Sequence, residues 1–187
     1  METTVTFTFF FLFTDKMQID PIKAEWEVKI MIEMLRLDFR LIHGQTGVYW
    51  TAKLGCDCIL IVSDTLLQDP IKLATVKLSK PSGVKLVIKN VEDSIRAIKS
   101  GVTDKYHMFI LTEKLAYAKR LMDGCDIRRL NLGGIMPSET SHHKLNDAVY
   151  CTPEEIVMLK EMMQKGYYLY LQQVPSENEV PLSAILK

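Results

Sequence analysis

Arg40 and His43 stand three residues apart in the segment RLDFRLIHGQ, residues 36–45, and both side chains suit phosphate chemistry. The arginine offers a planar, permanently charged fork that fits phosphate oxygens. The histidine can react at neutral pH, because a neutral imidazole ring attacks through one nitrogen while the other is oriented. Gly44 follows directly and leaves room for close approach of the backbone, and Gly44 and Gln45 are candidates to line the site. This spacing predicts a phosphate-binding turn in which His43 is the reacting group.

Two flanking elements are expected to position this turn. An apolar, strand-like run from Ile30 to Leu37 precedes it, and a helix-like run begins near Gln45. In an open α/β sheet, ligands bind at such turns, beyond the carboxyl ends of the strands. The N-terminus of the following helix has unpaired N–H groups and a positive dipole end, which favour an anion. The helix N–H groups and Arg40 could therefore hold a phosphoryl group without a metal ion.

Strand and helix signals alternate along the rest of the chain. Apolar runs predict strands at residues 57–62, 84–88, 106–111, 127–132 and 167–174, and a further short strand at 144–150. Helical patterns cover residues 45–54, 70–78, 91–99, 113–122 and 153–165, with capping residues or glycines at several ends. Repeated βα units of this size predict an α/β fold, a doubly wound, mainly parallel open sheet of about seven strands with helices on both faces.

Four more residues follow predicted strands and are candidates for the same site. Asp64 and Asp69 come after the second strand, where each could line the site or cap the next helix. Gly133 and Gly134 come after the fifth strand, although a pair of glycines more often forms a turn than a phosphate site. Both interpretations stay open for all four residues.

Composition excludes several classes of protein. Lys+Arg and Asp+Glu are equal at 23 each, and no basic patch stands out, so nucleic-acid binding is not expected. A length of 187 residues with 48% hydrophobic content fits one domain with a sizeable core. The four cysteines indicate reduced thiols in a cytosolic protein rather than a disulfide framework. The sequence has no Walker-type glycine loop, so direct use of ATP is not expected.

A metal protein is the main alternative class. Its ligands would be Cys56, Cys58, His142 and His143. The Cys-x-Cys pair lies at the start of a predicted buried strand, and no further cysteine pair completes a zinc set. We therefore expect neither a metal ion nor another cofactor.

The N-terminal segment does not fit the pattern of the rest. Val5 to Phe13 reads VTFTFFFLF, which is too short to span a bilayer, since a spanning helix needs about 20 residues. A secretory signal would need a basic region before it and a cleavage site after it. Residues 1–29 are interpreted as an extension outside the core fold, and 30–187 as the single domain. An added edge strand or a membrane-surface contact are the alternatives for this run.

Residues 31 to 175 resemble the B component of enzyme II from the mannose/fructose/sorbose family of the bacterial phosphoenolpyruvate-dependent sugar phosphotransferase system. The resemblance rests on segments that match in order: RLDFRLIHGQ (36–45), Trp50-Thr51, IVSD (61–64) with Asp69, PSGV (81–84), LNLGGIM (130–136) and QQVP (172–175). It covers roughly four-fifths of the chain.

The resemblance implies a doubly wound fold and a protein-phosphohistidine–sugar phosphotransferase. His43 matches the family's phosphorylated histidine, Arg40 matches the arginine used against the phosphate, and Asp38 matches an aspartate two residues before it. The domain would take phosphate from an A component and give it to a sugar held by membrane C and D components. It would be cytoplasmic and peripherally associated with the inner face of the bacterial membrane. Homodimers are common in the family.

Departures from the family pattern leave some points open. Many relatives have Asn-Asp where this chain has Ser63-Asp64, and often valine where Thr46 stands, which could shift the choice of substrate or partner. The first 30 residues have no counterpart. A regulatory relative that accepts phosphate but passes none to a sugar is the alternative function. The sugar cannot be identified from the sequence, because the membrane components would bind it.

Overall fold

The computed structural model describes residues 32–186, apart from the side chains of residues 45 and 46. The elements follow the alternation expected from the apolar runs and their caps. In chain order they are β1 (Ile32–Asp38), α1 (Gly44–Leu54), β2 (Cys58–Val62), the 3-10 helix η1 (Leu66–Gln68), α2 (Pro70–Leu78), β3 (Lys85–Lys89), α3 (Val91–Lys99), β4 (Met108–Thr112), α4 (Leu115–Cys125), β5 (Arg129–Gly134), β6 (His143–Lys144), β7 (Tyr150–Cys151), α5 (Pro153–Gln164), β8 (Tyr168–Leu171), β9 (Val180–Pro181) and the 3-10 helix η2 (Leu182–Ala184).

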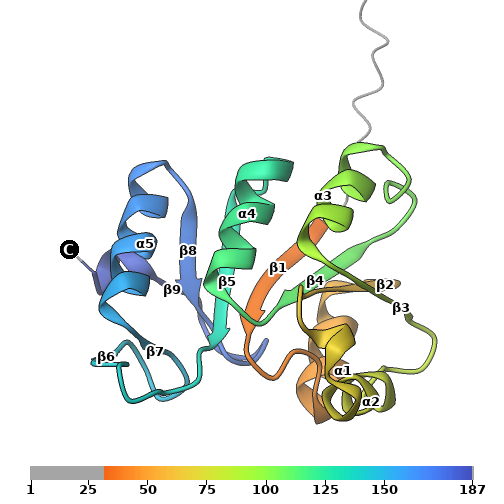
Figure 1. Cartoon of the computed structure of the whole chain (residues 1–187), viewed down its shortest axis with the longest axis horizontal. Coiled ribbons are helices and arrows are strands. Elements are labelled where there is room, and N and C mark those ends of the chain that lie inside the picture. Colours follow the sequence, from red (N-terminus) through yellow and green to blue (C-terminus); the bar gives the residue numbers. More distant parts are fainter. Residues whose placement is uncertain (1–31, 187) are drawn as a thin grey trace, which may run out of the picture.

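One seven-stranded sheet organises the described residues, with the strand order β3-β2-β4-β1-β5-β8-β9. Its strands pair in parallel except for the antiparallel pair of β8 and β9. Because β1 lies between β4 and β5, the chain winds outward from the middle of the sheet in both directions. The predicted doubly wound, mainly parallel fold is confirmed. Figure 1 shows α3, α4 and α5 side by side across one face of the sheet.

Two hydrophobic clusters hold the layers together, one on each face of the sheet. The first contains Leu60 of β2 together with buried residues of α3, α4 and α5. The second contains Ile59 of β2, Trp50 of α1 and Val76 of α2. Consecutive residues of β2 therefore point into different cores, which is why this strand reads as a continuous apolar run in the sequence.

Two predicted strands differ from the structure. The single strand predicted at 144–150 is wrong: β6 and β7 form a small separate hairpin. Asn146 causes the turn, because its side-chain oxygen accepts hydrogen bonds from the N–H groups of Ala148 and Val149. The strand predicted at 167–174 ends at Leu171, since the next two carbonyl groups bind side chains instead of a neighbouring strand. The seventh strand of the sheet is β9, which the sequence did not predict.

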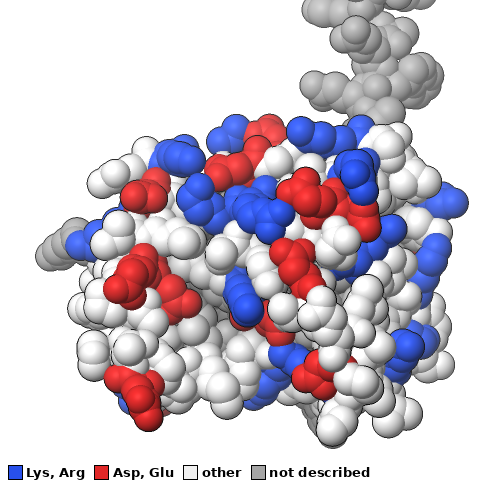
Figure 2. All heavy atoms as spheres, in the orientation of Figure 1, with Lys and Arg blue, Asp and Glu red and all other residues white. Residues whose placement is uncertain are grey.

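The distribution of surface charge and the lengths of the helices concern two classes considered above, nucleic-acid-binding and membrane-spanning proteins. In Figure 2, acidic and basic side chains are interspersed over the viewed face rather than gathered by sign. Arg120 of α4 pairs with Glu92 of α3 and with Asp64, which follows β2. Within residues 32–186, none of the helices has the length and apolar character that crossing a bilayer requires.

Candidate active site at the β1–α1 turn

The segment between β1 and α1 is a tight, strained turn at the carboxyl end of a central strand. The N–H of Leu41 donates to the carbonyl of Asp38 at 2.8 Å, which closes the turn. Leu41 has a φ of 58°, a left-handed conformation that costs an L-residue about 1–2 kcal/mol. Its side chain is 2% exposed and packs into the second hydrophobic cluster, which holds it there. Strain of this kind occurs most often at functional sites.

The start of α1 is open to an anion. His43 is the N-cap, and its side chain makes no capping hydrogen bond. The first helical hydrogen bond runs from the N–H of Gly47 to the carbonyl of His43, so the N–H groups of residues 44–46 precede the helix ladder. The first turn carries no acidic residue. Gly44 has a φ of 41°, which glycine adopts without strain. These groups present a positive helix end beside the imidazole ring.

His43 is half-buried at this helix end, on a strand-to-helix turn as predicted. Its Nδ1 lies 3.1 Å from the carbonyl oxygen of Leu41. With a proton on Nδ1 the ring donates to that carbonyl, and the contact then sets the orientation of the ring. A neutral ring keeps one unprotonated nitrogen for attack on phosphorus.

Arg40 pairs with Asp38 in this structure, which was the alternative to its predicted phosphate role. Its Nε lies 3.2 Å from Oδ1 of the carboxylate, and its backbone N–H donates to the same oxygen. The Arg40 side chain is 45% exposed, whereas that of Asp38 is fully buried. The phosphate role of Arg40 stays a prediction.

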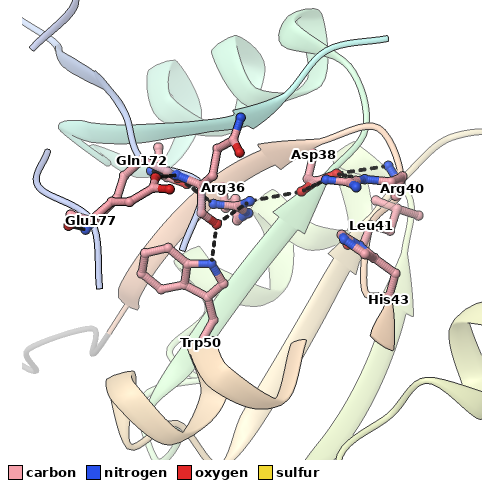
Figure 3. A network of polar contacts seen from close by, with 10 residues as sticks. Arg36, Asp38, Arg40, Leu41, His43, Trp50, Gln172 and Glu177 are labelled. Atoms are coloured by element: carbon pink, nitrogen blue, oxygen red, sulfur yellow. Dashed lines mark hydrogen bonds and ion pairs between the residues drawn. The ribbon is translucent and has the colours of Figure 1, made fainter. Parts of the chain in front are cut away.

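Arg36 belongs to the same network and was missed as a candidate. It is 1% exposed, and its Nη2 donates to Oδ2 of Asp38 at 3.0 Å. It also donates to the side chain of Asn131 and to the carbonyl groups of Gln172 and Gln173. Figure 3 shows the resulting line of groups from Gln172 through Arg36 and Asp38 to Arg40. An arginine inside an apolar strand is the sequence signal for such a network, because a buried charge must be paired.

Burial and the Asp38 carboxylate shift the pKa of Arg36 in opposite directions. Desolvation by burial lowers its pKa, and the nearby Asp38 carboxylate opposes part of that effect. The guanidinium also lies over the ring of Trp50, with 5.3 Å from Cζ to the ring centroid. The indole N–H of Trp50 donates to the carbonyl of Gln173. Helix α1 is thereby tied to the segment that follows β8.

Gly133 and Gly134 lie at the end of β5, beside this network. A Cβ on Gly133 would stand 2.0 Å from Cζ of Arg36, so only glycine leaves room for the guanidinium. A Cβ on Gly134 would stand 3.4 Å from Oδ1 of Asp38, which is close but tolerable. Gly134 pairs with Asp38 in the sheet, and its carbonyl accepts from the N–H of Phe39. The structure thus gives the two glycines a packing role, and contact with phosphate stays a prediction.

The other site residues predicted from the sequence have different surroundings. Asp69 caps α2, since its Oδ1 accepts from the N–H of Lys72. Asp64 accepts from the N–H of Val91 at the start of α3 and pairs with Arg120. Gln45 lies in the first turn of α1. For Asp69 the capping interpretation is confirmed. The cap predicted for Asp64 on the helix that follows it is wrong, because Asp64 binds the start of α3, whose N-cap is Asn90. That the two aspartates line the site stays a prediction.

A second polar cluster, also missed, occupies the same edge of the sheet at the ends of β2 and β4. Ser63 is 1% exposed and donates to Glu113, which also pairs with Lys72. Burial raises the pKa of Glu113, but the hydrogen bonds from Lys72 and Ser63 and the charge of Lys72 outweigh it, so the pKa is lowered overall. Glu113 is therefore held as an ionised carboxylate.

The residues of the metal alternative do not converge. Cys58 packs into the first hydrophobic cluster and Cys56 into the second. His142 and His143 lie before and within β6, in the hairpin that precedes α5. Among the described residues, no group of three or more His, Cys, Asp and Glu side chains is placed to hold a metal ion.

Comparisons with known proteins agree with the fold. The family model described as "PTS system sorbose subfamily IIB component" matches residues 32–187. A "probable phosphotransferase enzyme IIB component" of Streptococcus pyogenes is 30% identical over 162 residues, covering 83% of this chain and 99% of that protein. The mannose-specific EIIAB component of Escherichia coli is 25% identical, covering 84% of this chain and 49% of that protein. The crystal structure of the IIBSor domain of the sorbose permease from Klebsiella pneumoniae has a TM-score of 0.75 and 25% identity, covering 81% of this chain and 93% of that one.

Proposed function

The chain belongs to the sorbose-subfamily IIB component family of the phosphotransferase system, and from this membership we propose that it relays a phosphoryl group through His43 during sugar uptake. IIB components of this system are sugar phosphotransferase components. The observation that carries the finer proposal is the position of His43, at the uncapped N-terminus of α1 and three residues after Arg40. The open helix end and the arginine are the groups that phosphoryl transfer requires, since it depends mainly on positioning and charge stabilisation.

The proposed reaction has two steps. In the first, an imidazole nitrogen of His43 attacks the phosphorus of a phosphohistidine on the A component, and the N–P bond of the donor breaks as the new N–P bond forms. In the second, a sugar hydroxyl attacks the phosphoryl group on His43. An O–P bond forms, the N–P bond breaks, and the hydroxyl proton leaves to solvent. Arg40 and the N–H groups of residues 44–46 stabilise the three phosphoryl oxygens in both steps.

The partners follow from the family. The E. coli relative is a mannose-specific EIIAB component, which supports an A component as the phosphoryl donor for this chain. Membrane C and D components would hold the sugar, and the domain would work at the cytoplasmic face of the membrane. Relatives described above carry the names of sorbose and mannose, so membership of the family leaves the sugar open.

Reconstitution tests the proposal. Given phosphoenolpyruvate, the general phosphotransferase proteins and an A component, the chain should acquire an acid-labile, base-stable label on His43. His43→Ala should fold normally and take no label. His107→Ala is the matched control, because His107 pairs with Glu33 beyond the amino end of β4, and it should be labelled like the wild type. A label that persists in His43→Ala would overturn the assignment.

The second step separates a relay from the regulatory alternative. Sugar phosphate should appear only when membranes that carry the matching C and D components are added. ATP and a hexose with the soluble chain alone should yield none. A label on His43 that discharges to no sugar would instead support a regulatory phosphoacceptor, and direct labelling from ATP would contradict both functions.

A further inference from the structure

Asp38 lies between two arginines: Arg36 contacts Oδ2 of its carboxylate, and Arg40 contacts both oxygens, with 3.5 Å from its Nη2 to Oδ2 (Figure 3). Its Oδ2 accepts from Nη2 of Arg36 at 3.0 Å, and its Oδ1 accepts from Nε of Arg40 at 3.2 Å. Its side chain is fully buried, so the carboxylate needs these donors in place of water. Two cationic side chains thus share one anionic carboxylate, so the three side chains together carry one net positive charge.

The two arginines differ in their freedom to move. The Arg36 side chain is 1% exposed and is held by the carbonyl groups of Gln172 and Gln173 and by Asn131. The Arg40 side chain is 45% exposed and lies on the turn itself. Arg36 therefore neutralises Asp38 permanently, whereas Arg40 can leave the carboxylate without stranding a buried charge.

We propose that Asp38 is an internal substitute for phosphate, which holds Arg40 while His43 is unphosphorylated and releases it to the phosphoryl group when His43 is loaded. The inference rests on the proposed function of His43. Asp38 and the phosphoryl group compete for one guanidinium, so the resting ion pair offsets part of the stabilisation of phosphohistidine. The phosphoryl group is then bound firmly enough to be accepted and weakly enough to be passed on. Arg36 acts as a positioning residue that keeps the Asp38 side chain fixed throughout.

Nuclear magnetic resonance on the wild-type chain tests the exchange of partners without any substitution. The ¹⁵Nε and Hε resonances of Arg40 should shift when His43 is phosphorylated, whereas those of Arg36 should stay in place. The ³¹P signal of phosphohistidine reports loading in the same sample. Loaded protein in which the Arg40 resonances do not move would overturn the inference and leave the proposed function standing. Absence of the phosphohistidine signal would overturn the proposed function, and the inference with it.

A double-mutant cycle measures the competition. Asp38→Asn should raise the equilibrium fraction of phosphorylated chain, at a fixed ratio of phosphorylated to free A component, by on the order of tenfold, the factor that one charge-assisted hydrogen bond supplies. A merely structural role for Asp38 would lower that fraction. In an Arg40→Leu background the same substitution should change it by less than about twofold, because the shared guanidinium is gone.

Asp123→Asn is the matched control, since it also converts an ion-paired acid to an amide but lies near the end of α4 and pairs with Lys119. It should leave the phosphorylated fraction unchanged. An increase of equal size with and without Arg40 would show that Asp38 acts by another route and would contradict the proposal. If Asp38→Asn fails to fold because Arg36 has lost its counter-charge, the resonance measurement on the wild type still decides.

Discussion

At the residue scale, the proposed phosphate site contains two arginines that differ in exposure, Arg36 and Arg40. Arg40 was selected from the sequence because it precedes His43 by three residues. Arg36 was not selected, although the structure makes it the centre of the network. Its partners Asn131 and Gln172 are 95 and 136 residues away in the chain, and local spacing cannot predict contacts over such distances. The position of His43 on a strand-to-helix turn could therefore be predicted from the sequence, but the buried network that supports the turn could not.

Arg40 should be needed for the rate of transfer and not for folding. Arg40→Leu should slow phosphoryl transfer from the A component by about 10²-fold or more, the usual loss when one donor to a developing anion is removed. Arg40→Lys should recover only part of the rate, because an ammonium lacks the planar fork. Rapid-quench measurement of labelling gives these rates. Arg96→Leu on α3, which removes a 77% exposed arginine, is the control. Wild-type rates in both Arg40 variants would show that Arg40 is only the structural ion-pair partner of Asp38.

Gly133 should be intolerant of even one added carbon atom. In Gly133→Ala the new Cβ would overlap the guanidinium of Arg36, and overpacking of this kind costs about 1–3 kcal/mol. Gly134→Ala, the neighbouring control, places its Cβ at 3.4 Å from Asp38 and should cost less. Chemical denaturation gives both free energies of unfolding. Equal stability of the two variants would show that Arg36 can move aside, which would weaken its assignment as a fixed positioning residue.

At the scale of elements, helix ends were the most predictable feature. The Thr152-Pro153-Glu154-Glu155 start of α5 forms a capping box, and Asp69-Pro70 starts α2, both as predicted. These signals are local, since a cap and its target N–H lie within three residues of each other. The hairpin of β6 and β7 and the strand β9 were missed because each contains only two residues per strand. Strands this short have no apolar period to detect.

The stability of the folded chain should fall in acid because of Asp123, which links α4 to the residue before β8. Hydrogen bonds from Lys119 and Tyr167 hold the pKa of this carboxyl at about 2, below the ordinary value of 3.8. A carboxyl with a depressed folded pKa contributes stability that is present above its unfolded pKa and is lost as pH falls toward the folded pKa. Wild-type chain should therefore lose stability between about pH 4 and pH 2 more steeply than Asp123→Asn. Thermal unfolding across that range measures both slopes, and parallel curves would show that the pair contributes nothing.

At the scale of the whole molecule, the sheet explains why the groups of the proposed site lie at one end of the fold. The parallel strands end at one edge, which brings together the β1–α1 turn, the glycines of β5 and the carbonyl groups after β8. The repeated βα units in the sequence predicted a parallel sheet whose strands end at a common edge. The handedness of the crossovers limits the possible strand orders. The strand order itself determines that Arg36 of β1 meets Asn131 of β5, because these two residues are partners in the parallel ladder.

We propose that residues 30–187 form the domain and that residues 1–29 are an extension outside it, a segment that lies outside the described residues. Strand β1 is paired with β4 on one side and β5 on the other, so a strand from the extension could join the sheet only at β3 or β9. Deleting residues 1–30 should therefore leave the melting temperature and the phosphorylation of His43 unchanged. It should also raise solubility, because it removes VTFTFFFLF, a run of high β-propensity without charge. Circular dichroism melts, labelling and sedimentation of the two forms provide the comparison. A truncated chain that unfolds would show that the run packs on the core or extends the sheet at β3 or β9, and would move the start of the domain toward the N-terminus.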